Sequence, residues 1–337
     1  MAELRFDVLG IGNAIVDVLA RADDDLLVRE RLAKGSMRLI DAAEAERIYG
    51  ALGPAVESSG GSAGNTVAGV ASLGGRGAFI GKVADDQLGA IYRHDMRALG
   101  VTFDTPPLAD AGVPTARSMI LVTPDGERTM NTYLGAAQAL GPEDIDEGVV
   151  AASAITFLEG YLWDPPRAKD AFRRAATLAH AAGRRVALTL SDSFCVDRYR
   201  AEFLDLIRSR TVDILLANVG ELRSLYETAH LPTALAALQA DAPLAAVTSG
   251  EDGSYVVTPG RIDHVAVDPV ETVVDATGAG DLYAAGFLLG LARGIPLTDA
   301  ARLGSLAAAE VISHMGARPA TPLKQLAAEA GFEMGKW

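Results

Sequence analysis

Apolar segments rich in β-branched residues alternate with segments of helical periodicity through most of this chain. The apolar runs lie at 6–12, 154–160, 185–190 and 212–218. Strands that alternate with helices predict an α/β fold, in which a mostly parallel central sheet is covered by helices. From residue 244 the pattern changes to short strand-like runs, which we expect to form a sheet edge. Two helical stretches at 280–293 and 297–314 are expected to cap that edge.

Two stretches fit poorly into this alternation, residues 18–57 and residues 105–134. The second stretch is typical of a β-hairpin that turns at Pro-Asp-Gly, 124–126. We expect the two stretches to pair as a small separate sheet, which would act as a lid over the carboxyl ends of the core strands. The chain 1–337 is then a single unit, with a core of about 1–17, 58–104 and 135–337 and a lid of about 18–57 and 105–134.

The charge of the chain restricts its partners. The sequence contains 44 acidic and 30 basic residues, a formal net charge of −14. Nucleic acid and anionic membrane surfaces attract basic patches, so we expect neither as a partner. No apolar run approaches the roughly 20 residues that a membrane span needs, and the first residues do not resemble a secretion signal. We expect a cytoplasmic protein that acts on a small molecule.

The segment 275–281, DATGAGD, stands between a strand-like run and a helical run. Its two central glycines allow successive N–H groups to turn toward one point, and the start of the helix adds unpaired amides and a partial positive charge. Such a nest binds phosphate. A carboxylate beside it, Asp281, could accept a proton from an attacking hydroxyl group. Taken alone, the motif favours a plainer interpretation, an aspartate that caps a helix after a glycine turn.

DATGAGD resembles the second signature of the ribokinase-type (PfkB) carbohydrate kinase family, and further motifs follow the order of that family along nearly the whole chain. The resemblance implies a ribokinase-like three-layer sandwich and an ATP-dependent kinase that uses Mg²⁺. It also implies that Asp281 is the catalytic base, and that the anion hole for the transferred phosphoryl group consists of Gly278, Ala279 and Gly280.

Two motifs near the N-terminus resemble the acceptor-binding part of the family. SGGSAGNTVAGVASLGG, from residue 59, resembles the first signature, which implies sugar contacts at Gly60, Gly61 and Asn65. By itself, this segment is equally compatible with a glycine-rich loop before a helix. GNAIVD resembles the start of adenosine kinases, which implies substrate contacts at Asn13 and Asp17. A carboxylate at Asp17 suits the vicinal diol of a ribose, because it accepts two hydrogen bonds.

Two further features bear on the acceptor. The glycines at 10 and 12 also resemble the opening of a dinucleotide-binding fold, but the third glycine position is Ile15 and an acidic segment follows, so we disfavour a dehydrogenase. Tyr161 follows a strand-like run at the predicted sheet end, where its ring could stack on a base. An aromatic residue that only walls the core is the plainer alternative.

Two later motifs resemble the nucleotide-binding part of the family. NVGEL resembles the NxxE motif, which implies that Asn218 lies near the triphosphate and that Glu221 binds Mg²⁺ through water. Mg²⁺ prefers oxygen ligands and usually keeps several waters. VTSGEDGSY resembles the nucleotide loop, which implies ATP contacts at Thr248, Gly250 and Gly253. A helix cap and a hairpin turn are the respective alternatives.

The resemblance also extends to a cation and to the lid. Asp275 and Thr277, with carbonyl groups from 316–319, match positions that hold a monovalent cation such as K⁺ in many family members. Arg128 lies on the expected lid, where the family suggests a contact with the transferred phosphate. A solvated arginine in a hairpin is an equal alternative.

We therefore expect ATP-dependent phosphoryl transfer to the 5′-hydroxyl of adenosine, giving AMP and ADP. Ribose, another nucleoside or a ketohexose remains an alternative acceptor, because residues that bind a diol do not require an attached base. A non-catalytic nucleoside-binding protein on the same fold is an alternative of another class. Either a monomer or a homodimer is compatible with the sequence.

Overall fold

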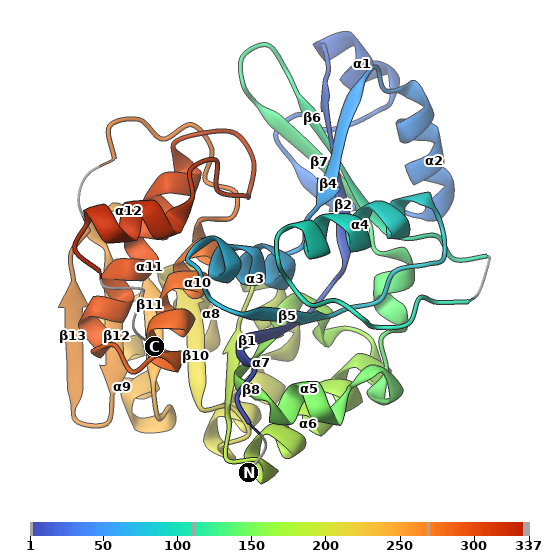
Figure 1. Cartoon of the computed structure of the whole chain (residues 1–337). Helices are drawn as coiled ribbons and strands as arrows, with labels where there is room; N and C mark the ends of the chain where they lie inside the picture. The colour runs from blue at the N-terminus through green and yellow to red at the C-terminus, as the bar shows by residue number, and fades with distance from the viewer. Residues whose placement is uncertain (1–2, 110–111, 268–269, 333–337) are drawn as a thin grey trace.

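The computed structural model describes residues 3–109, 112–267 and 270–332. Within these residues, the larger sheet has eight strands in the order β13-β12-β11-β10-β9-β8-β1-β5 (Figure 1). Its strands are β1 (Phe6–Ile11), β5 (Gly77–Ile80), β8 (Ser153–Glu159), β9 (Arg185–Thr189), β10 (Ile214–Asn218), β11 (Ala245–Thr248), β12 (Ser254–Thr258) and β13 (Arg261–Val265). Only the pairings of β12 are antiparallel among those in this sheet. The predicted α/β fold is thus confirmed.

Helices cover both faces of this sheet, because the strands are apolar on both sides. On β1, Val8 belongs to one hydrophobic cluster, whereas Leu9 and Ile11 belong to a second cluster on the opposite face. The first cluster includes α3 (Ser62–Ser72), α4 (Gln87–Ala98), α10 (Ala279–Ala292), α11 (Leu297–Ile312) and α12 (Leu323–Glu329). The second includes α5 (Glu147–Ala151), α6 (Pro166–Ala181), α7 (Ser193–Arg208), α8 (Val219–Leu225) and α9 (Leu231–Asp241). These layers form the predicted three-layer sandwich.

A second sheet stands beside the core, in the order β3-β7-β6-β2-β4 (Figure 1). Its strands are β2 (Ile15–Arg21), β3 (Met37–Leu39), β4 (Ala55–Ser59), β6 (Ala116–Val122) and β7 (Arg128–Tyr133). Helices α1 (Asp24–Arg29) and α2 (Ala42–Ala51) lie between β2 and β4 along the chain. The predicted small sheet and its β6–β7 hairpin are confirmed. β2 begins before residue 18 and β4 ends after residue 57, because both strands continue directly into loops of the core.

Short 3₁₀ helices occur where the chain turns at the end of strands or between elements. They span Gly135–Ala139, Pro142–Asp144, Gly160–Trp163 and Gly250–Asp252. Over the part of the chain that the structure describes, no helix has the length and apolarity to cross a membrane.

Helix α10 is buried on nearly every side, since it packs against α3, α11 and the sheet. α10 and α11 correspond to the two helical stretches predicted near the C-terminal end. They approach most closely where Gly286 faces Gly304. A Cβ atom on Gly286 would lie 2.6 Å from the backbone nitrogen of Gly304 and 2.6 Å from the carbonyl oxygen of Leu303. The backbones of the two helices can touch only because neither residue carries a side chain.

We expect Gly286→Ala to destabilise the protein, because a methyl group at this crossing must push two backbones apart. Overpacking of this kind costs about 1–3 kcal/mol. Gly50→Ala is the matched control, since Gly50 lies exposed in α2 and nothing lies within 4 Å of an added Cβ. There we expect a gain of about 0.5–1 kcal/mol from helix propensity. Urea unfolding measures both free energies, and an unchanged midpoint for Gly286→Ala would contradict the close crossing.

Candidate functional site

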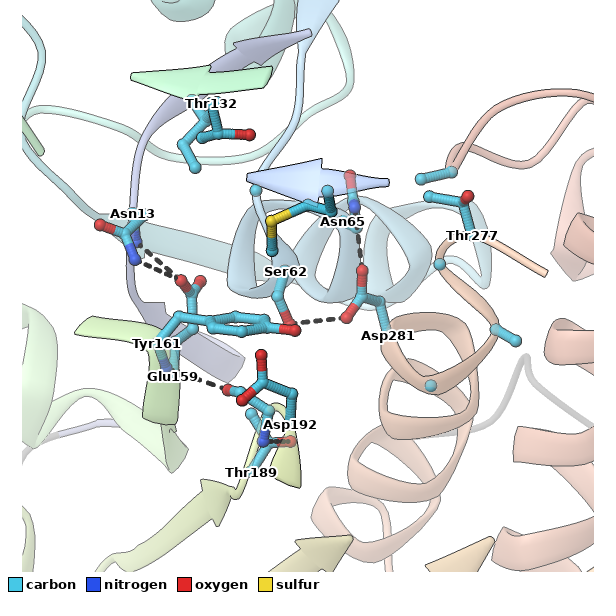
Figure 2. Close-up of a pocket in the computed structure, with 18 of the residues that line it drawn as sticks. Asn13, Ser62, Asn65, Thr132, Glu159, Tyr161, Thr189, Asp192, Thr277 and Asp281 are labelled. Atoms are coloured by element: carbon cyan, nitrogen blue, oxygen red, sulfur yellow. Dashed lines mark hydrogen bonds between the residues drawn. The ribbon is translucent and has the colours of Figure 1, made fainter. Parts of the chain in front are cut away.

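A cavity of 1170 Å³ lies where the carboxyl ends of the core strands face the small sheet. In open α/β sheets ligands bind at this edge. Most of the predicted site residues line this one cavity, many of them visible in Figure 2. These residues are Asn13, Asp17, Gly61, Asn65, Tyr161, Asn218, Glu221, Thr248, Thr277, Gly278, Ala279, Gly280 and Asp281. The predicted residues that do not line it are Gly60, Arg128, Gly250, Gly253 and Asp275.

Asp281 lies in the first turn of α10 and is held by the first turn of α3 (Figure 2). The Ser62 hydroxyl donates a hydrogen bond to Asp281 Oδ1 at 2.6 Å, and Asn65 Nδ2 donates to Oδ2 at 2.9 Å. The cap of α10 is Gly278, with φ +80°, and no side chain caps it. The interpretation of Asp281 as a capping residue is therefore wrong, because its carboxylate is turned toward a different helix. Burial raises the pKa of Asp281, and the two donors oppose that rise.

Glu159, at the end of β8, is a buried carboxylate that sequence reasoning missed. It accepts a hydrogen bond from Asn13 Nδ2 at 2.7 Å (Figure 2). It also accepts one from the backbone N–H of Ala63 at 2.8 Å. Burial raises the pKa of Glu159 to about 7, against the effect of these donors. Its interactions fix Asn13 and the start of α3. The available sequence signal was a single acidic residue that ends an apolar strand-like run.

Asp17, on β2, faces the cavity beside the start of α3. Burial raises the pKa of Asp17 to about 6, while the Arg318 guanidinium opposes the rise and the Asp281 carboxylate adds to it. A Cβ atom on Gly60 would collide with the Asp17 carboxylate. Gly60 thus makes room for a cavity residue without lining the cavity itself.

Arg318 is a second residue that sequence reasoning missed. Its guanidinium donates hydrogen bonds to the carbonyl oxygens of Ser59 and Gly64, each at 2.9 Å, so it links the end of β4 to the first turn of α3. The sequence analysis used only the carbonyl groups of this segment, and no motif indicated that the side chain of Arg318 would lie beside the carboxylates of the cavity.

The nucleotide motif NVGEL forms a helix start as well as a cavity wall. Asn218 caps α8, and its Oδ1 accepts a hydrogen bond from the Glu221 N–H at 2.8 Å. In return, Glu221 accepts from Asn218 Nδ2 at 2.6 Å and from Asn218 N–H at 3.0 Å. Burial raises the pKa of Glu221 to about 7. The helix-cap alternative is therefore correct as structure, and both residues still face the cavity.

The second nucleotide motif follows β11. Thr248 lines the cavity, and Gly250 and Gly253 have φ values of +58° and +90° in the turn between β11 and β12. These positive φ values account for the glycines, so the hairpin alternative also describes the local structure. Within the described residues, no group of three or more His, Cys, Asp or Glu side chains is arranged to hold a metal ion.

Two aromatic side chains lie at another part of the cavity wall, Tyr161 after β8 and Phe194 in the first turn of α7. Tyr161 is 36% exposed and Phe194 is 79% exposed. The alternative in which Tyr161 only walls the core is therefore wrong, since its ring borders open space. Sequence reasoning missed Phe194, because a lone aromatic residue at a helix start is indistinguishable from a core residue.

The lid residue Arg128 forms an ion pair with Asp275, at 2.6 Å between Nη1 and Oδ2. The same Nη1 lies 3.2 Å from the Thr277 hydroxyl oxygen. The predicted phosphate contact and two predicted cation ligands are thus in contact with one another. Arg128 is not a solvated hairpin arginine, since its side chain is largely buried.

Comparisons with known proteins agree with this fold and cavity. Residues 37–324 match the model of the pfkB family carbohydrate kinases. A probable sugar kinase from Rhizobium etli is 53% identical, with 98% of this chain and 100% of that chain covered and a TM-score of 0.90. An adenosine kinase from Sinorhizobium meliloti is 59% identical, with 97% and 100% covered and a TM-score of 0.89. An ATP-dependent ribose-1-phosphate kinase from Halopiger xanaduensis is 33% identical over 69% of this chain and 73% of its own length.

The fold and these comparisons define an ATP-dependent kinase of sugars or nucleosides. The chain belongs to the pfkB family of carbohydrate kinases, as its signature motifs predicted.

Proposed function

We propose that this kinase transfers the γ-phosphoryl group of ATP to the 5′-hydroxyl of adenosine, giving AMP and ADP. The observation that carries the proposal is the position of Asp281. Its carboxylate lies beside the glycine turn of α10 and faces the same cavity as the candidate acceptor residues Asn13, Asp17 and Asn65. The 59% identity with the Sinorhizobium meliloti adenosine kinase supports the choice of acceptor.

Asp281 acts as the general base in this proposal. The hydrogen bonds from Ser62 and Asn65 orient its carboxylate, so that a free lone pair meets the primary hydroxyl of the acceptor. The amides of Gly278, Ala279 and Gly280, at the positive end of α10, stabilise negative charge on the transferred group. Catalysis is then mainly a matter of positioning and electrostatic stabilisation, as is general for phosphoryl transfer.

The sugar ring of the acceptor binds near two amide oxygens that have no partner. Asn13 Oδ1 and Asn65 Oδ1 are both buried and accept no hydrogen bond from the protein. A buried acceptor without a partner costs free energy, and hydroxyl groups of a bound sugar supply the missing donors. The Asp17 carboxylate accepts from the vicinal diol. Gly61, at the start of α3, lines the same part of the cavity.

The base of the acceptor stacks against Tyr161 and Phe194. An aromatic side chain that is exposed to the cavity loses water-exposed apolar surface when a planar base covers it. A free sugar gains little from these rings, so their exposure favours a nucleoside. The second candidate, a kinase of ribose, another nucleoside or a ketohexose, is supported by the 53% identity with the probable sugar kinase. A non-catalytic nucleoside-binding protein is disfavoured because Asp281, the proposed catalytic base, and the glycine turn are both present.

ATP binds at the end of the cavity that Asn218 and Thr248 line, with the backbone at Gly250 and Gly253 close to it. Each Glu221 oxygen already accepts a hydrogen bond from Asn218, which leaves lone pairs for water. Glu221 thus fits an indirect role, in which it would hold Mg²⁺ through water. A bound Mg²⁺ would supply charge neutralisation at the triphosphate.

We expect adenosine to be the preferred acceptor in an assay of ADP formation with adenosine, inosine, guanosine, ribose and fructose. Phe194→Ala should raise KM for adenosine about fivefold, by loss of stacking worth about 1 kcal/mol, and should leave turnover of ribose unchanged. The exposed Val28, on α1, provides the control variant Val28→Ala. Comparable turnover of a free sugar would transfer the assignment to a sugar kinase, and no turnover of any acceptor would favour the binding protein.

Asp281→Asn should lower kcat by roughly 10²–10⁴, because an amide cannot accept the proton. Adenosine binding, measured by calorimetry, should remain, since Asn still accepts a hydrogen bond from Ser62. Asp299→Asn is the control, because Asp299 lies exposed on α11 and pairs only locally with Arg302. Retention of more than about a tenth of kcat by Asp281→Asn would exclude general-base catalysis.

The affinity for the acceptor should depend on the charge of Asp17. Since its pKa is about 6, protonation as the pH falls through 6 removes one acceptor of the diol, and KM for adenosine should rise. Well above pH 7, where the Glu159 carboxyl that holds Asn13 is also ionised, KM should be constant. Asp17→Asn should have a high KM without this dependence. A titration of KM in the wild type that persists in Asp17→Asn would show that another group causes it.

A further inference from the structure

The Asp275 carboxylate has no free lone pair for a metal ion. Its Oδ1 accepts hydrogen bonds from the Thr277 hydroxyl at 2.7 Å and from the Thr277 N–H at 3.1 Å. Its Oδ2 accepts from the Gly316 N–H at 3.0 Å and pairs with Arg128 Nη1 at 2.6 Å. A carboxylate offers about four acceptor positions, and these four donors use them all.

The donors to Asp275 come from three separate parts of the chain, so the fold as a whole positions them around this carboxylate. Thr277 belongs to the glycine turn before α10, Gly316 follows α11, and Arg128 begins β7 of the lid. The side chains of Arg128 and Asp275 are 12% and 5% exposed. The pair is therefore shielded from water, where an attraction between opposite charges is stronger than at the surface.

A positive charge beside Asp275 would favour binding of the transferred phosphoryl group. Asp275 stands just before the turn of Gly278, Ala279 and Gly280, where the transferred phosphoryl group is proposed to bind. An uncompensated carboxylate there would repel that group and weaken the effect of the amides. Either a bound monovalent cation or a side-chain cation removes the repulsion.

We infer that the Arg128 guanidinium takes the place of the monovalent cation at Asp275, so that the lid itself supplies the charge and the enzyme works without K⁺. Asp275, predicted to hold K⁺, does not fit an ion in this arrangement, because both of its carboxylate oxygens and the Thr277 hydroxyl are engaged and a guanidinium lies beside them. Arg128 is a positioning residue in this inference, acting through Asp275 on the glycine turn. The inference rests on the proposed phosphoryl transfer.

The charge on Arg128 is directed at Asp275 and Thr277. Nη1 bonds to both of them, and Nη2 lies 3.5 Å from the Met315 sulfur. A separate contact with phosphate would require the guanidinium to leave the ion pair, which would expose the Asp275 carboxylate to the same phosphate. Replacement of the ion is therefore the role that the geometry favours over direct phosphate binding.

The test compares the wild type with Arg128→Gln and Arg128→Lys, in K⁺ and in tetramethylammonium at constant ionic strength. Tetramethylammonium is too large for an oxygen-lined ion site. Lys34→Gln is the matched control, because Lys34 is also a lid cation but pairs only with Asp24 and Asp125 of the lid region. Turnover of ATP with adenosine and the thermal unfolding midpoint are measured for each protein.

We expect equal wild-type turnover in the two salts. Arg128→Gln should lose turnover in tetramethylammonium. Added K⁺ should raise its turnover several-fold until the effect saturates, and K⁺ alone should raise its unfolding midpoint. Arg128→Lys should need K⁺ less than Arg128→Gln does, and Lys34→Gln should match the wild type. Because the midpoint does not require turnover, a K⁺-specific rise in Arg128→Gln alone would support the inference even if adenosine is not the acceptor.

Two outcomes would overturn the inference. Saturable activation or stabilisation of the wild type by K⁺ would show that an ion binds despite Arg128. Equal loss of turnover by Arg128→Gln in both salts, with no K⁺-specific change of its unfolding midpoint, would show that Arg128 acts on the phosphate or on the lid alone. The comparison of the wild type in the two salts shows whether K⁺ binds despite Arg128, even if a variant fails to fold.

Discussion

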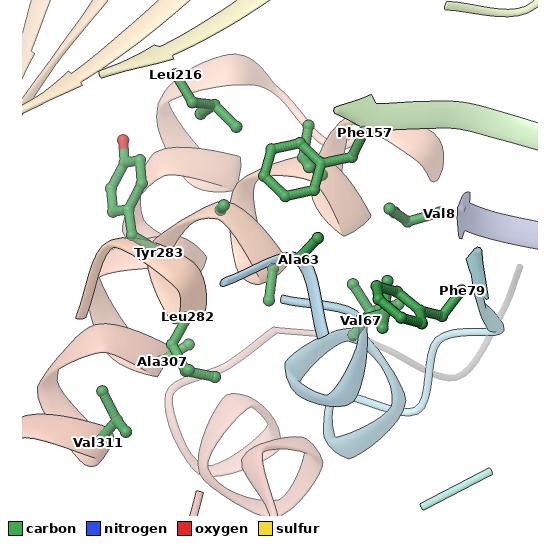
Figure 3. Packing of buried hydrophobic residues seen from close by; sticks show 14 of the residues in the cluster. Val8, Ala63, Val67, Phe79, Phe157, Leu216, Leu282, Tyr283, Ala307 and Val311 are labelled. Carbon is green, nitrogen blue, oxygen red and sulfur yellow. The ribbon is translucent and has the colours of Figure 1, made fainter. Parts of the chain in front are cut away.

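The contact between the first turns of α3 and α10 is the constraint on which the rest of the site depends. The two helices contribute to one hydrophobic cluster, which includes Ala63 and Val67 of α3 and Leu282 of α10 (Figure 3). This packing sets the distance between the helix starts, so that side chains of α3 reach the Asp281 carboxylate. Because core packing tolerates little displacement, it fixes the orientation of Asp281, the proposed catalytic base, better than a loop could.

The same contact brings several carboxylates together in a partly buried region, where an ionised group is less stable than in water. Burial raises the pKa of Asp17, Glu159 and Asp281 alike. Three features oppose this cost: the donors on Glu159, the positive ends of α3 and α10, and the Arg318 guanidinium. Arg318 acts on Asp17 and Asp281 through charge, although its hydrogen bonds go to backbone carbonyls. Clustered carboxylates whose pKa values are raised by burial are typical of active sites, which is consistent with the proposed function.

The sequence predicted the fold well because the fold depends on local periodicity. Alternating strands and helices specified the parallel sheet, and the poor fit of 18–57 and 105–134 indicated the small sheet. The cavity residues within signature motifs were predicted for the same reason, since each motif is short and contiguous. Ser62, Glu159, Phe194 and Arg318 were missed because their importance arises from neighbours that are distant in sequence. The ion pair between Arg128 and the predicted cation ligand Asp275 was missed for the same reason, because it joins a position in the lid to a position in the core.

In the proposed function, reaction type and acceptor choice depend on different parts of this structure. The glycine turn and Asp281 lie on helices packed in the core, where substitutions disturb both stability and chemistry. Tyr161 instead lies in the short 3₁₀ helix after β8, and Phe194 lies in the first turn of α7 after β9. Ile120 and Thr132 of the lid sheet line the same cavity. Loops and lids tolerate change far better than packed helices. One core can therefore serve kinases of sugars and nucleosides, and our proposal assigns the choice of acceptor to the segments after β8 and β9 together with the lid.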